Sequence, residues 1–150
     1  MQDLSPWGFS RDIQVNVSLE GVPDVLHLSD SARVRQTVIY ASIRDEGLPL
    51  KIGITRRSLW QRWSGTIRVI GAEKERIKLR DNEWNDRDCW RHHVLGRSFD
   101  VWSKPTESVR IQYTKDLPAY KAAIAEAEEE YLDALLEPVI GKSLRLRGKL

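Results

Sequence analysis

The sequence predicts an α+β fold, a small mixed or antiparallel sheet of about three core strands that is flanked by helices and preceded by an N-terminal β extension. Runs rich in β-branched and aromatic residues fill the first part of the chain, and the clearest helical pattern comes near its end. The chain has 150 residues, 41% hydrophobic and 31% charged, so it fits one domain with a core of its own.

Alternation of apolar and polar residues predicts the first strand. In DIQVNVSLE, every second residue from Ile13 to Leu19 is apolar, which is the pattern of a strand with one wet face. The run DVLHL follows a break that contains Gly21 and Pro23, so the two runs can form a hairpin. We expect them to make up a β extension over residues 1–36 that packs on the main domain.

A second hairpin is predicted by the runs TVIYASI and LKIGIT. Both are rich in β-branched or aromatic residues, and the loop between them contains Asp45 and Gly47, which favour turns. A further strand is predicted by FDVWSK, where Phe99 and Val101 flank a polar residue, although Trp102 breaks the alternation.

Two helices are predicted by their end signals. Ser58 with Gln61 three residues later is a capping-box pattern, which starts a helix directly after the second hairpin. The clearest helix, DLPAYKAAIAEAEEEYLDALLEP, starts at Asp116 and ends near Pro138. Residues 68–97 mix charges with only weak helical spacing.

One acidic residue of the last helix lies on its apolar side. Drawn at about 100° per residue, the helix has an apolar stripe with Glu128 in its middle. The stripe consists of Ile124, Ala127, Tyr131, Leu132 and Leu135, while Glu126, Glu129, Glu130 and Asp133 project to the opposite or flanking side. A buried-side carboxylate must be paired, neutralised or bound to a cation, because its desolvation otherwise costs several kcal/mol. Glu128 therefore either forms a structural ion pair at the edge of the core or acts as a metal ligand or general acid/base.

Composition narrows the classes of partner. The single cysteine, Cys89, excludes an internal disulfide, and the chain has no leader pattern and no apolar run of about 20 residues. We therefore expect a cytoplasmic protein without a membrane partner. The net charge of +2 hides basic clusters between Arg56 and Arg91 and in a basic C-terminal tail, residues 142–150. Such clusters permit a nucleic-acid partner.

The motifs VIY and KIG, an arginine nine residues after the KIG glycine and a helix-borne glutamate together resemble the GIY-YIG nuclease family. Tyr40 matches the tyrosine of the family's first tripeptide, and Lys51 stands where most members have the second tyrosine. Arg62, in GITRRSLWQRW, matches the catalytic arginine. Glu128 matches the glutamate that holds one divalent metal. The resemblance implies a GIY-YIG-like nuclease domain over residues 37–141.

Three departures from the family pattern bear on activity. Val38 replaces the first glycine, a change that suits a strand. Lysine in place of the second tyrosine is found in a restriction-endonuclease branch of the family, so Lys51 points toward that branch. The asparagine that often closes the family's last motif is missing after Pro138, where the chain reads VIGKS.

The resemblance implies a metal-dependent DNA endonuclease of a restriction-like, phage or mobile-element type. Tyr40 would act as the general base, since a nearby ammonium group from Lys51 favours a phenolate. The planar fork of Arg62 would bind two phosphate oxygens, and Glu128 would hold one Mg²⁺ or Mn²⁺. A restriction enzyme that cuts both strands would favour a homodimer.

Other interpretations fit the same residues. One is a catalytically weak or inactive nucleic-acid-binding module of the same fold, and another is a phosphodiesterase that acts on RNA. Non-specific phosphate contacts are predicted for the basic residues Arg56, Arg57, Arg68, Lys142, Arg145 and Arg147. The segment CWRHH holds too few ligands for a structural zinc site, although His92 or His93 could assist near the phosphate. The tryptophans are predicted to pack in the core or at its edge.

Overall fold

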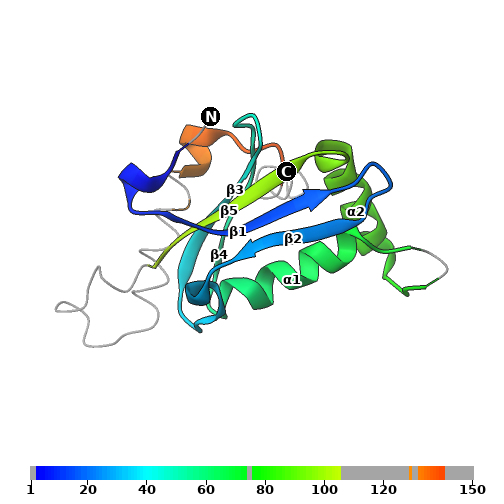
Figure 1. Ribbon diagram of the computed structural model, residues 1–150, viewed down its shortest axis with the longest axis horizontal. Coiled ribbons are helices and arrows are strands. Elements are labelled where there is room, and N and C mark those ends of the chain that lie inside the picture. Colours follow the sequence, from blue (N-terminus) through cyan, green and yellow to red (C-terminus); the bar gives the residue numbers. More distant parts are fainter. Residues whose placement is uncertain (1–2, 74–75, 106–128, 130–131, 141–150) are drawn as a thin grey trace, which may run out of the picture.

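The computed structural model describes residues 3–73, 76–105, 129 and 132–140. Its main element is a five-stranded antiparallel sheet with the strand order β2-β1-β5-β3-β4 (Figure 1). The strands are β1 (Ser10–Val17), β2 (Pro23–Leu28), β3 (Val38–Arg44), β4 (Pro49–Thr55) and β5 (Ser98–Pro105). The helices are α1 (Leu59–Ile70) and α2 (Asp81–Val94), with the 3-10 helices η1 (Ser5–Trp7) and η2 (Asp30–Arg33) and helical residues at 129 and 132–136.

The predicted α+β class is confirmed, but the sheet has five strands where about three were expected. The difference comes from the N-terminal hairpin, because β1 pairs with β2 on one side and with β5 on the other, where Ile13 lies opposite Val101. The two N-terminal strands therefore belong to the central sheet. Leu19 is 76% exposed, contrary to the predicted alternation, because β1 ends at Val17 and the chain turns at Gly21.

Different elements cover the two faces of the sheet at β3 and β4. Helices α1 and α2 pack on one face, where Tyr40 and Phe99 join the main buried cluster. Leu4 and Leu132 cover the other face. Figure 1 shows the orange turn of residues 132–136 beside η1 and away from α1 and α2. Side chains that alternate along β3 thus enter two separate cores.

Helix α1 begins and ends with specific hydrogen bonds. The Ser58 hydroxyl accepts from the Gln61 amide at 3.1 Å and the Gln61 side chain accepts from the Ser58 amide at 3.3 Å, so the predicted capping box is confirmed. At the other end, Arg91 of α2 donates from Nε to the Ile70 carbonyl at 2.8 Å, and Arg87 donates to the carbonyl two residues later at 3.0 Å. The first bond satisfies a carbonyl that a helix leaves unpaired at its C-terminus, and the second holds the loop that follows the helix. None of the described helices is long and apolar enough to cross a membrane.

The described turn of the C-terminal helix buries a different side from the predicted one. Leu132 is buried, but Leu135, which was predicted on the apolar stripe, is 49% exposed. Glu129 was predicted on the opposite or flanking side, yet it is 8% exposed. The reason is that Leu132 and Leu136 pack against β3 and β4, which turns Glu129 inward and Leu135 outward. In this turn the prediction is therefore confirmed at Leu132 and wrong at Glu129 and Leu135. Glu128 itself lies outside the described residues.

After this turn the chain runs along the outer edge of β4. The Val139 amide donates to the Pro49 carbonyl at 3.2 Å, and the Ile140 amide donates to the Leu50 carbonyl at 2.7 Å. The side chains of Val139 and Ile140 pack with the cluster on the α1 and α2 face, whereas Leu132 packs on the other face. The chain therefore passes from one face of the sheet to the other at this edge.

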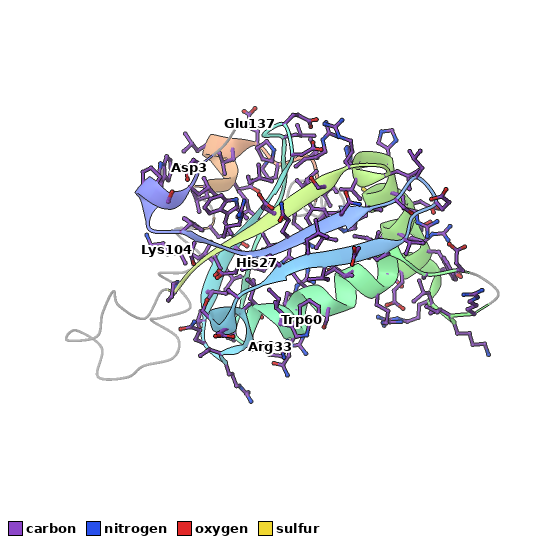
Figure 2. The ribbon with its side chains drawn as sticks, in the orientation of Figure 1. Asp3, His27, Arg33, Trp60, Lys104 and Glu137 are labelled. Atoms are coloured by element: carbon purple, nitrogen blue, oxygen red, sulfur yellow. The ribbon has the colours of Figure 1, made fainter. Side chains whose placement is uncertain are left out.

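Charged residues lie on the outer face of β1, β2 and β5. The Nη1 atom of Arg11 is 3.8 Å from Oδ2 of Asp100, and His27 of β2 lies on the front of the sheet in Figure 2. Burial raises the pKa of Asp100, and the charges of Arg11 and His27 oppose this rise. This face lies opposite the one that carries α1 and α2.

A buried carboxylate joins three elements at one end of the sheet. Asp12 is 1% exposed and sits at a bulge of β1. Its Oδ1 atom accepts from the hydroxyls of Ser29 at 2.7 Å and Ser31 at 2.9 Å, both at η2, and its Oδ2 atom accepts from Ser103 of β5. Hydroxyl groups thus replace the water that burial removes from this charge.

We predict that Asp12→Ala lowers the free energy of unfolding by about 2–3 kcal/mol, because it removes the acceptor shared by η2 and β5 and leaves the buried Ser103 hydroxyl without it. Asp24→Ala, at an exposed position on β2, should change it by less than about 0.5 kcal/mol. Urea denaturation of both variants measures the difference. Equal losses in the two would show that the serine cluster adds nothing to stability.

Candidate functional site

A cleft of about 760 Å³ lies between α1 and α2, with Lys51 of β4 in its wall. The described part of its lining is mainly cationic, because it contains Lys51, Arg57, Arg62, Arg68 and Arg80 and, among the described residues, two carboxylates, Glu83 and Asp86. Trp90 and Ile140 supply part of the apolar lining. The excess of positive charge suits this cleft to phosphate groups.

Tyr40 lies next to this cleft but outside its lining. The side chain is 2% exposed, and its ring and hydroxyl lie against Gly53, the residue directly opposite on β4. A methyl group at position 53 would collide with the Tyr40 ring. The glycine of KIG is therefore required by the close approach of this ring.

Arg62 connects Tyr40 to the cleft. Its Cζ atom lies 5.8 Å from the centre of the Tyr40 ring, and its Nη1 atom donates to the Thr66 hydroxyl at 2.9 Å. The guanidinium lines the cleft and covers the tyrosine. The structure thus brings together the two residues that the motif pattern had paired across the hairpin and the first turn of α1.

Lys51 lies on the same face of the hairpin as Tyr40. Lys51 pairs with Ser42, which lies two residues after Tyr40 on β3 and therefore on the same face of the sheet. Lys51 also lines the cleft. Cys89 also lines the cleft. Burial raises the pKa of its thiol, the charge of Asp86 raises this pKa further, and the charge of Lys51 lowers it. Lys51 and Asp86 are therefore both within electrostatic range of one thiol.

The α2 wall of the cleft was not predicted. Four of its residues, Asn82, Asn85, Asp86 and Cys89, follow the spacing i, i+3, i+4 and i+7 and so share one helix face. Helix α2 buries only two of its residues, Trp90 and Val94, so its sequence needs few apolar residues and shows only a weak apolar pattern. The signal that could have revealed this wall is the same helical spacing applied to polar residues.

The predicted phosphate contacts divide into three groups. Arg57 and Arg68 line the cleft, and Arg68 is also 3.8 Å from a Glu83 carboxylate oxygen. Arg56 is exposed but outside the lining. The tail residues Lys142, Arg145 and Arg147, like Glu128, lie outside the described residues.

The histidines of α2 lie away from the cleft lining. Burial lowers the pKa of His93, and the charges of His92 and Arg44 lower it further, so this environment favours the neutral imidazole. Among the described residues, no three His, Cys, Asp or Glu side chains could jointly hold a metal ion. Trp63 and Trp90 are buried, as predicted.

We predict that Gly53→Ala lowers the free energy of unfolding by about 1–3 kcal/mol, because the new methyl group displaces the Tyr40 ring. Gly65→Ala is the matched control, since a Cβ there meets no atom within 4 Å, and it should stabilise α1 by about 0.5–1 kcal/mol. Urea denaturation measures both changes. A Gly53→Ala protein as stable as the wild type would contradict the packing described here.

The single cysteine provides a test of the cleft charges. We predict that Asp86→Asn speeds alkylation of Cys89 by iodoacetamide at pH 8, because loss of the carboxylate lowers the thiol pKa and raises the thiolate fraction. Lys51→Met should slow it for the opposite reason. Mass spectrometry of the alkylated protein gives the rates, and Asp88→Asn, outside the lining, is the control. Unchanged rates in both cleft variants would mean that neither charge lies near Cys89.

No protein-family model, no curated protein and no solved structure matches the chain.

Proposed function

We propose that the protein is a metal-dependent DNA endonuclease whose active site is the α1–α2 cleft. The observation that carries the proposal is the position of Arg62, which covers Tyr40 while it shares the cleft lining with Lys51. Tyr40, Lys51 and Arg62 come from two strands and a helix, and they are the residues that the GIY-YIG resemblance pairs with base and phosphate chemistry. Their proximity supports a common role.

In this proposal Arg62 binds two oxygens of the scissile phosphate through its planar fork and stabilises the charge that develops there. Tyr40 takes a proton from the attacking water, and the ammonium group of Lys51 favours the phenolate that this role requires. Tyr40 is 2% exposed beneath Arg62.

The metal part of the proposal depends on Glu128, which lies outside the described residues. A bound Mg²⁺ or Mn²⁺ would neutralise phosphate charge and assist the leaving oxygen. The carboxylates described in the cleft are those of Glu83 and Asp86, and Glu83 already accepts from the Arg80 amide at 3.1 Å. A homodimer that cuts both strands stays a prediction.

The burial of Tyr40 favours a second candidate function. A residue that is 2% exposed packs in the core whether or not it reacts, so the same cleft could bind nucleic acid without hydrolysing it. The two functions share the cationic lining and differ in turnover.

Plasmid nicking in the presence and absence of Mg²⁺ separates the two. We predict Mg²⁺-dependent nicking that Glu128→Ala abolishes and that Arg62→Ala slows by about 10²–10³-fold, the usual effect of removing a group that stabilises transition-state charge. Arg62→Lys should recover little, since a lysine cannot bind two oxygens in one plane.

Two variants serve as controls. Arg11→Ala removes one positive charge from the outer face of the sheet, and Glu20→Ala removes an exposed carboxylate, so both should nick at the wild-type rate. Tight DNA binding with no Mg²⁺-dependent nicking would leave only the binding function.

A further inference from the structure

Gly65 lies in the middle of α1, where the fold gives no reason for a glycine. Its backbone is helical, and a Cβ added to it would meet no atom of the described residues within 4 Å. Gly53 and Gly71 differ, because a Cβ there would collide with Tyr40 and with Pro23. A glycine inside a helix costs about 1 kcal/mol relative to alanine. Packing among the described residues does not explain this cost at position 65.

Gly65 belongs to the exposed rim of the α1–α2 cleft. Gln61, Gly65 and Arg68 follow the spacing i, i+4 and i+7, so they share one side of α1. All three line the cleft and are exposed, and we call them the rim. Arg62 and Thr66 also line the cleft but are half-buried, so they lie deeper. The missing side chain of Gly65 therefore leaves a gap in the rim beside Arg62.

Cations lie on both sides of this gap. Within the described part of the chain, neither Arg57, just before α1, nor Arg62 forms an ion pair. Arg68 is 3.8 Å from a Glu83 oxygen, and its side chain is still 53% exposed. From Arg62 to Arg68 the helix rises about 9 Å, whereas one DNA strand advances about 3.4 Å per phosphate. This stretch of α1 can therefore meet about three successive phosphates of one strand.

We propose that the sugar–phosphate backbone of one strand of duplex DNA lies across the rim at Gly65, with its phosphates on Arg57, Arg62 and Arg68. The glycine lets this backbone approach α1 closely enough for Arg62 to reach a phosphate from below the rim. The rest of the duplex stays outside the cleft. Gly65 is thus a positioning residue, and its contact is with the DNA backbone, which carries no base sequence.

This inference rests on the proposed function for the identity of the ligand, and binding tests it without cleavage. Fluorescence anisotropy in EDTA measures the affinity for a labelled duplex. We expect Gly65→Leu to weaken binding about tenfold, because the new side chain occupies the gap and displaces the strand. The loss should be equal for two duplexes of unrelated sequence.

Gly65→Ala separates a positioning role from a structural one. It should weaken binding about threefold, because a methyl group fills part of the gap, and yet raise the free energy of unfolding, because alanine favours the helix. Urea denaturation and anisotropy of the same preparation give the two values. A glycine with only a structural role would change both in the same direction.

Matched variants control for size and charge. Ser64→Leu places the same side chain one residue earlier on α1, outside the lining, and should keep the wild-type affinity. Arg57→Ala and Arg68→Ala should each reduce the slope of log Kd against log salt concentration by about 1, the effect of one lost phosphate contact. Arg11→Ala, on the outer face of the sheet, should leave the slope unchanged.

Wild-type affinity in Gly65→Leu, equal losses in Gly65→Leu and Ser64→Leu, or a loss confined to one DNA sequence would each overturn the inference. Duplex binding that Gly65→Leu weakens as expected, with no Mg²⁺-dependent nicking by the wild type, would refute the endonuclease and leave this inference standing. Nicking that Gly65→Leu leaves at the wild-type rate at limiting DNA concentration would refute the inference alone.

Discussion

The ring of Tyr40 lies across Gly53 because position 53 has no side chain, and Trp63 of α1 packs edge-on against that ring with 5.4 Å between the ring centres. Trp63 also packs against Trp90 of α2 and Phe99 of β5, with 5.6 Å and 6.0 Å between the respective ring centres. Aromatic pairs of this kind contribute about 0.5–1.5 kcal/mol each beyond the area they bury. The sheet and both long helices are therefore joined at one tryptophan, and the cleft between the helices follows from that junction.

The same junction explains why residues of the motif pattern that are separated in sequence lie close together in the fold. Arg62 precedes Trp63, so when the tryptophan enters the core, the arginine is rotated to its side and lies over Tyr40. The position of Lys51 on the same face as Tyr40 follows from the register of the hairpin, because alternate residues of a strand lie on the same face. These placements depend on short stretches of chain and could be predicted. Glu128 is a different case, because its helix is far along the sequence and its position depends on contacts with the sheet.

Local signals predicted local structure, and the failures concern contacts between distant segments. The serine cap of α1 and the alternation along β1 each depend on a few neighbouring residues. The pairing of Ile13 with Val101 is not, and it is this pairing that enlarges the sheet to five strands. The buried side of the C-terminal helix was predicted wrongly at Glu129 and Leu135, since a mixed helix can turn either face inward and the sheet decides which. The α2 wall was missed because its lining residues are polar, so the sequence of α2 shows little of the apolar periodicity by which a helix is predicted.

Both edges of the sheet are blunted. At β4, residues 139–140 occupy the backbone groups of Pro49 and Leu50. At β2, the pairing with β1 leaves out Leu26, and a bulge of this kind distorts the row of amides and carbonyls that another strand would need. Neither edge is thus a flat template for a strand from another molecule. If two copies of the chain associate, we expect their contact surface on helices, loops or a face of the sheet, and not through a strand added at either edge.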